Sequence, residues 1–117
     1  PEQPTLGALV LGCKLPARSF GEVGEAGMAD LARATAGVEA MLRDAIGYEK
    51  INYLMLMMVD PDVHFHVLPR YDGTREAAGI ALPDTGWPGP PRLGDGRKLT
   101  HDEITALCRH LAAHWPG

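Results

Sequence analysis

The sequence has 117 residues, 45% of them hydrophobic, and a formal net charge of −4. This length predicts one domain, with room for one core but not for two. The acidic balance argues against a broad basic face that would bind a nucleic acid polymer. No apolar run approaches the roughly 20 residues of a membrane helix. Cys13 and Cys108 form neither a CxxC pair nor a zinc spacing, so we expect a reducing cytoplasm.

The first half of the chain predicts a strand, a long helix and a second strand. The run TLGALVLGCKL, between Pro4 and Pro16, is short and apolar and predicts a strand. From about Glu25 the apolar positions recur every three or four residues, which predicts a helix that ends at Gly47 as a left-handed cap. INYLMLMMV, residues 51–59, is apolar almost throughout and predicts an interior strand covered on both faces. The helical stripe comprises Met28, Leu31, Thr35, Val38, Leu42 and Ala45.

The second half predicts a turn, a strand, a long loop and a final helix. DPD, residues 60–62, predicts a turn, and VHFHVLP, residues 63–69, predicts the antiparallel partner of the preceding strand. Residues 72–99 hold many of the glycines and prolines and predict a long loop rather than a second domain. Thr100 and Glu103 form a capping-box pattern. The helix that they begin carries on one face Ile104, Leu107, Leu111 and Trp115.

The strand after the turn carries a polar stripe. Asp62, His64 and His66 stand at alternate positions, so they share one face of a strand. Two imidazoles about 7 Å apart along a strand could straddle a phosphate, one attacking phosphorus while the other donates hydrogen bonds to an oxygen. Arg70 adds a fixed positive charge just past them. The other face carries Val63, Phe65 and Val67, which can pack under the long helix.

Other interpretations of these polar residues stay open. The stripe could be structural, or it could hold zinc or iron, because all three of its side chains are good ligands, although no fourth ligand stands nearby in the sequence. His110 and His114 share a face of the last helix and are interpreted as solvated residues. Trp87, in GWPGPP, is interpreted as a loop anchor in preference to a surface on which a base stacks.

The stretch VHFHVLPR resembles the signature of the histidine triad (HIT) family of nucleotide hydrolases and transferases, whose pattern is His-x-His-x-His followed by apolar residues. The order of elements over residues 5–71 also follows the family. DTGWPGPPRLG resembles the WPxP segment of a bacterial branch. The resemblance implies an α+β fold, with an antiparallel sheet, one long helix packed on a face and a C-terminal helix, as a single domain over residues 1–117. The family's first hairpin has no clear counterpart before Thr5.

The same resemblance implies roles for the polar stripe. His64 is the nucleophile that attacks the α-phosphorus and forms a nucleotidyl-histidine, and His66 hydrogen-bonds phosphate oxygens. Asp62 stands in place of the family's first histidine, where its carboxylate would favour a protonated imidazole and repel phosphate, which predicts a slow enzyme. Arg70 and Trp87 are our candidate substrate-binding residues.

These observations predict a hydrolase or nucleotidyl transferase that acts on a nucleoside phosphate derivative without a metal or another cofactor. The resemblance also implies a homodimer whose sheets join, and we expect neither a nucleic acid polymer nor a membrane as a partner. The alternative is a non-catalytic nucleotide-binding or metal-binding module. The family's Gly-Gln-Ser or Gly-Gln-Thr segment is replaced by MMVDP, which favours the alternative, whereas His64 and His66 favour catalysis.

Overall fold

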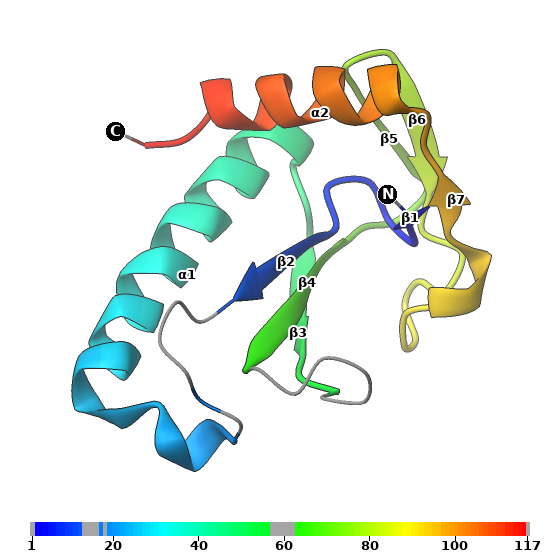
Figure 1. Ribbon diagram of the computed structural model, residues 1–117. Coiled ribbons are helices and arrows are strands. Elements are labelled where there is room, and N and C mark those ends of the chain that lie inside the picture. The colour runs from blue at the N-terminus through cyan, green and yellow to red at the C-terminus, as the bar shows by residue number, and fades with distance from the viewer. Residues whose placement is uncertain (1, 13–16, 18, 57–62, 117) are drawn as a thin grey trace.

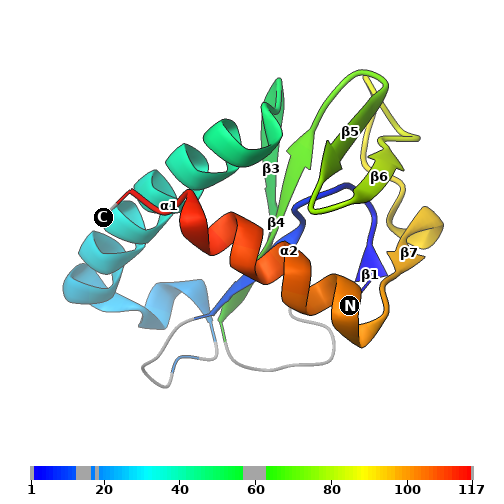
Figure 2. The ribbon, with the colours of Figure 1, turned by 90° about the horizontal axis from the view of Figure 1, so that it is seen from above.

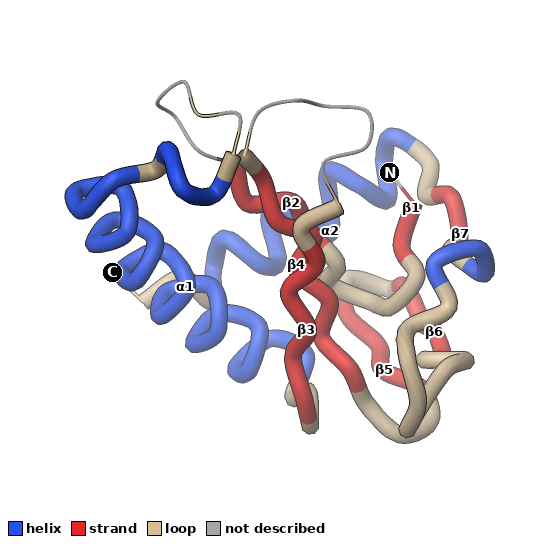
Figure 3. The backbone as a smooth tube through the Cα atoms, turned by 90° about the horizontal axis from the view of Figure 1, so that it is seen from below, coloured by secondary structure: helices blue, strands red, loops and turns tan. Residues whose placement is uncertain are grey.

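The computed structural model describes residues 2–12, 17, 19–56 and 63–116, and it has the α+β architecture that the sequence predicts (Figure 1). Three antiparallel strands lie in the order β2-β4-β3, with β4 in the middle (Figure 3). Two further antiparallel pairs are β1 with β7 and β5 with β6. The strands are β1 (Glu2–Gln3), β2 (Leu9–Gly12), β3 (Lys50–Leu54), β4 (His64–Arg70), β5 (Thr74–Ala77), β6 (Ile80–Pro83) and β7 (Arg97–Lys98).

Both predicted helices are present, and each begins or ends where its local signals indicate. The long helix α1 spans Gly24–Ile46 and ends at Gly47, whose φ of 70° is left-handed and whose N–H donates to two carbonyls of the last turn. The final helix α2 spans His101–Ala113, with both hydrogen bonds of the predicted capping box formed at its start. Two short 3-10 helices, η1 (Phe20–Glu22) and η2 (Leu93–Asp95), lie in the connections. No helix among the described residues is long and apolar enough to cross a membrane.

The prediction that residues 51–59 form an interior strand is wrong for the part that the structure describes. β3 ends at Leu54 and pairs with β4 alone among the described strands, so it lies at an edge of the sheet. Its residues are half-buried or exposed rather than fully covered. Apolar content alone does not distinguish a central strand from an edge strand that packs one face on a helix. The predicted turn at residues 60–62 lies outside the described residues.

The long loop predicted over residues 72–99 contains regular structure. A hairpin joins β5 and β6 through Ala78 and Gly79, whose φ angles are 54° and 77°. Positive φ at both central residues is the mark of a type I′ turn, which usually carries asparagine or glycine first. Because alanine occupies that position, no local sequence signal predicted this hairpin. The hairpin contributes to the core through Ala77, Ile80 and Leu82.

The core lies between the sheet and α1. Leu42 of α1 and Val67 of β4 are fully buried in one cluster, and Phe65 packs against its rim. Tyr53 of β3 donates to the Glu39 carboxylate of α1 over 2.6 Å, which ties the edge strand to the helix. Burial first, and then this carboxylate, raises the pKa of Tyr53 well above its usual value. As predicted, the odd-numbered side chains of β4 face the long helix.

Helix α2 crosses from the β1–β7 pair, where it begins, to α1, where it ends (Figure 2). At this crossing the His114 imidazole lies 2.5 Å from the carboxylate of Asp44. The Trp115 ring covers α1 at Gly37, where an added Cβ would lie 2.5 Å from the ring. The absence of a side chain at Gly37 therefore leaves room for the Trp115 ring. This explains why glycine, which weakens a helix, stands in the middle of α1.

We expect Gly37→Ala and Trp115→Ala to be coupled. Alanine in the middle of a helix is more favourable than glycine by about 1 kcal/mol, but its Cβ would displace the Trp115 ring. Gly37→Ala should therefore stabilise the Trp115→Ala protein by about that amount and the unaltered protein by less, or not at all. Urea unfolding of the four proteins of this cycle measures the difference. Equal gains in both backgrounds would contradict the contact.

Candidate functional site

One face of the three-stranded sheet is turned away from α1 and carries both histidines. His64, His66, Leu68 and Arg70 alternate with the core-facing residues of β4, so they share this face. Directly paired residues of neighbouring strands point to the same side. The register therefore adds residues of β2 and β3 to what we call the histidine face: Val10, Gly12, Lys50, Asn52 and Leu54.

The two imidazoles lie close together. Their ring centroids are 5.3 Å apart, with the ring planes at 74° to one another. Both side chains are half-buried, so they are held by their surroundings yet accessible to a ligand. As strand alternation predicts, the two rings share one face. A pair at this separation can contact two oxygens, or one oxygen and the phosphorus, of a single phosphate group.

The surroundings of the histidines are small or apolar. Val10 is the direct neighbour of His66 on β2, Leu54 is its neighbour on β3, and Gly12 is the neighbour of His64. Val10 is 61% exposed, so the described part of the chain leaves the face beside His66 open. An exposed valine next to a histidine pair gives an apolar surface on which a ligand could lie.

Asp62, the third member of the predicted stripe, lies outside the described residues. Among those described, no group of three His, Cys, Asp or Glu side chains is placed to hold a metal ion. A site completed by Asp62 lies outside the described residues, so the catalytic and the metal-binding interpretations of the stripe both stay predictions.

Arg70 is buried at the other end of the histidine face. Its side chain is 4% exposed, and its Nε donates to the Asp84 carboxylate over 2.7 Å. Its Nη1 donates to the Asn52 side chain over 2.8 Å, and its Nη2 donates to the Gly89 carbonyl, also over 2.8 Å. These bonds, with a second one from Nη2 to the Asp84 carboxylate, use four of the five guanidinium N–H groups, so most of its donors are engaged within the protein and contact with a substrate phosphate stays a prediction. In this arrangement Arg70 fastens the loop after β6 to the sheet.

Asp84 is the partner that sequence reasoning missed. Besides Arg70, its carboxylate accepts hydrogen bonds from the backbone N–H groups of Tyr71 and Gly86. An added Cβ on Gly86 would lie 2.3 Å from the Pro90 carbonyl, so this tight loop requires glycine. The DTG sequence at residues 84–86 is a turn signal, because an aspartate can accept from the N–H two residues on, but nothing local reveals its pairing with Arg70.

A small pocket opens beside Arg70 on the histidine face. Its volume is about 300 Å³, and its lining comes from β3, from Arg70 and from the loop that Arg70 holds. Trp87 is half-buried and belongs to this lining, so both a loop anchor and a surface for a ring stay open as its role. We call this the Trp87 pocket; its lining residues are Lys50, Asn52, Arg70, Trp87, Pro88, Gly89 and Pro90.

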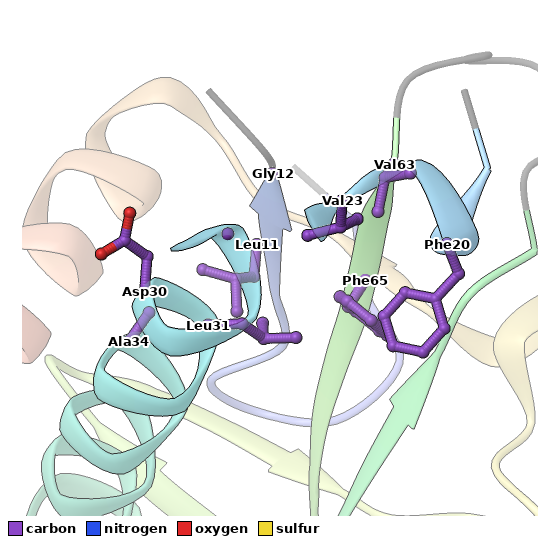
Figure 4. A pocket seen from close by; sticks show the side chains of 10 residues that line it. Leu11, Gly12, Phe20, Val23, Asp30, Leu31, Ala34, Val63 and Phe65 are labelled. Atoms are coloured by element: carbon purple, nitrogen blue, oxygen red, sulfur yellow. The ribbon is translucent and has the colours of Figure 1, made fainter. Parts of the chain in front are cut away.

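A larger, apolar pocket of about 440 Å³ lies on the opposite side of β4 (Figure 4). Phe65 and Leu11 line it from the sheet, and Leu31 lines it from α1. These odd-numbered strand residues face away from His64 and His66. The two imidazoles therefore do not face the larger pocket, and a ligand that contacts both of them would lie on the histidine face.

We expect Arg70→Met to destabilise the fold strongly, because it leaves the Asp84 carboxylate buried without its charged partner. Removing one member of a buried ion pair costs about 3–5 kcal/mol. A suitable control is Arg33→Met, which removes the Asp30–Arg33 pair, whose side chains are both 71% exposed, and such pairs contribute about 0–1 kcal/mol. Chemical denaturation measures both changes. Similar small losses would show that the Arg70–Asp84 pair does not fasten the loop.

Comparison with known proteins identifies the architecture. No protein-family model and no curated protein matches the sequence. Among solved structures, a histidine triad protein from Sinorhizobium meliloti has 26% identity and a TM-score of 0.72, covering 92% of this chain and 73% of its own. A hypothetical histidine triad nucleotide-binding protein from Sulfolobus tokodaii has 19% identity and a TM-score of 0.69, covering 96% and 71%. A histidine triad protein from Bradyrhizobium japonicum has 23% identity and a TM-score of 0.68, covering 92% and 75%. These likenesses agree with the resemblance seen in VHFHVLPR: the chain has the fold of histidine triad proteins.

Proposed function

We propose that this protein hydrolyses or transfers the nucleotidyl group of a nucleoside phosphate derivative, with His64 as the nucleophile. The observation that carries the proposal is the pair of half-buried imidazoles, 5.3 Å apart, on an open face of the sheet. The fold shared with histidine triad proteins supports it, and one of those neighbours is described as nucleotide-binding. A side-chain nucleophile splits one difficult displacement into two easier ones.

The two displacements assign distinct tasks to the two histidines. In the first, an imidazole nitrogen of neutral His64 bonds to the α-phosphorus as the bond to the leaving group breaks, and the leaving group takes up a proton from solvent. In the second, water or another acceptor attacks the same phosphorus and loses a proton to solvent as the phosphorus–nitrogen bond breaks, which releases the nucleotide and restores neutral His64. His66 donates a hydrogen bond to a nonbridging oxygen, where negative charge concentrates in each transition state.

The second candidate is a module that binds nucleotide without turnover. The replacement of the family's Gly-Gln-Ser or Gly-Gln-Thr segment by MMVDP, residues 57–61, favours it. The two candidates make opposite predictions for a labile substrate. Incubation with an adenosine phosphoramidate should release free AMP if the protein is a catalyst and should leave the substrate intact if the protein only binds.

We expect His64→Ala to abolish release of AMP while leaving the fold unchanged. His66→Ala should retain the nucleophile but lose a donor to the transition state, which typically costs about 10²–10³ in rate. His101, an exposed residue at the start of α2, provides the control His101→Ala, which should be as active as the unaltered protein. Turnover by a correctly folded His64→Ala protein at the original rate would contradict the assignment.

Exhaustive chelation is the companion measurement for the same assay. A side-chain nucleophile needs no metal-activated water, so AMP release should survive chelation. Loss of activity on chelation, with recovery on adding zinc or iron, would instead support a metal site at the polar stripe.

We also propose a homodimer that joins two sheets through an edge strand, because β2 and β3 each have one edge that pairs with no other described strand. An unpaired edge is a template for a partner strand. Sedimentation equilibrium should give twice the mass of the chain at micromolar concentration. A monomer at these concentrations would contradict the proposal without affecting the assignment of His64.

A further inference from the structure

The Trp87 pocket and the histidine pair lie on the same face, one beyond the other along β4. Asn52 is paired with Leu68 and Lys50 with Arg70, so they stand two and four residues beyond His66 along the strand. At a rise of about 3.3 Å per residue these offsets are roughly 7 and 13 Å. Leu68 of β4 is 2% exposed, so a substituent on a phosphorus atom held by the histidines reaches the pocket along the β3 side of this face, over Leu54 and Asn52.

The pocket is too small for a whole nucleotide. Its volume, about 300 Å³, lies at the lower end of the roughly 300–1,000 Å³ typical of small-molecule sites. One aromatic ring with a short substituent fits this space. The Trp87 ring in the lining provides a flat surface on which such a ring can stack.

The charges of the lining favour an anion. Arg70 and Asp84 are paired and balance each other. Lys50 then gives the pocket a net positive charge, at the end farther from the histidines. The Asn52 amide accepts from Arg70 through Oδ1, which fixes its orientation and leaves Nδ2 as the end that can donate to a ligand. A carboxylate on the far side of an aromatic ring would meet both of these donors.

We infer that the Trp87 pocket binds the leaving group of the substrate, and that this leaving group is a planar aromatic moiety carrying a carboxylate or a similar anion. The inference rests on the proposed function, since it assigns a binding site to the leaving group of the same substrate. Trp87 recognises the ring, and Lys50 recognises the charge. Arg70 is a positioning residue, which holds the loop and orients Asn52.

Three adenosine 5′-phosphoramidates separate the ring from the charge: those of methylamine, benzylamine and 4-(aminomethyl)benzoate. In the unaltered protein kcat/KM should rise in that order. Trp87→Ala should lower the benzyl-to-methyl ratio by about three- to tenfold. Lys50→Gln should lower only the carboxybenzyl-to-benzyl ratio, by about two- to tenfold, whereas Lys98→Gln, on exposed β7, should change neither ratio. Using ratios cancels any general loss of activity that a variant causes.

A binding measurement keeps this test independent of turnover. In a Trp115→Phe protein that also carries His64→Ala, Trp87 is the one tryptophan, and the carboxybenzyl probe should quench its fluorescence saturably. Lys50→Gln should weaken that binding. Turnover of all three probes with ratios that neither variant changes would overturn the pocket assignment and leave the function standing. Saturable quenching without any turnover would overturn the function and support the pocket, and failure of both measurements would overturn both.

Discussion

Strand β4 can bury only one of its faces, and this constraint positions both the core and the histidines. Val67 is fully buried in the cluster that α1 covers, and His66 is its immediate neighbour in sequence. A slip of one residue in the pairing of β4 would exchange the two faces, moving Val67 toward solvent and His66 under the helix. Burying an imidazole without a partner is costly. Hydrophobic packing on one side of the sheet therefore fixes the position of the histidines on the other.

The histidine face is itself divided into an open end and a closed end. Val10, beside His66, is 61% exposed, whereas Arg70 is 3% exposed. Arg70 can be buried because Asp84 balances its charge and because Asn52 and Gly89 accept its remaining hydrogen bonds. Because Arg70 is paired with Asp84, its charge is not available to a ligand, but the same contacts hold the loop that carries Trp87 beside β3. Polar residues that look equivalent in a strand pattern thus have different tasks, set by what folds over them.

The sequence predicted those features that depend on local chemistry. The left-handed end of α1 at Gly47, the capping box of α2 and the alternation of β4 each follow from a few neighbouring residues, and the structure has all three. Features that depend on distant parts of the chain were not predictable. Whether β3 is central or at an edge depends on which strands lie beside it, and the pairing of Arg70 with Asp84 joins residues 14 apart through a hairpin that had no sequence signal. The role of Asp62 stays a prediction, as do the roles of the two histidines.

The packing of Arg70 affects how substitutions on this face should be interpreted. A variant of Arg70 would release Asp84, Asn52 and the loop bearing Trp87 together, so lost activity would not by itself place Arg70 against a substrate. Lys50 and Trp87 differ from Arg70 in this respect, because the one is exposed and the other half-buried at the surface of the pocket. Arg70 is buried and held by several hydrogen bonds, so it can keep the pocket in place, while the more accessible Lys50 and Trp87 contact the ligand. Substitution of Lys50 or Trp87 should therefore alter the discrimination between substrates, and substitution of Arg70 should alter stability.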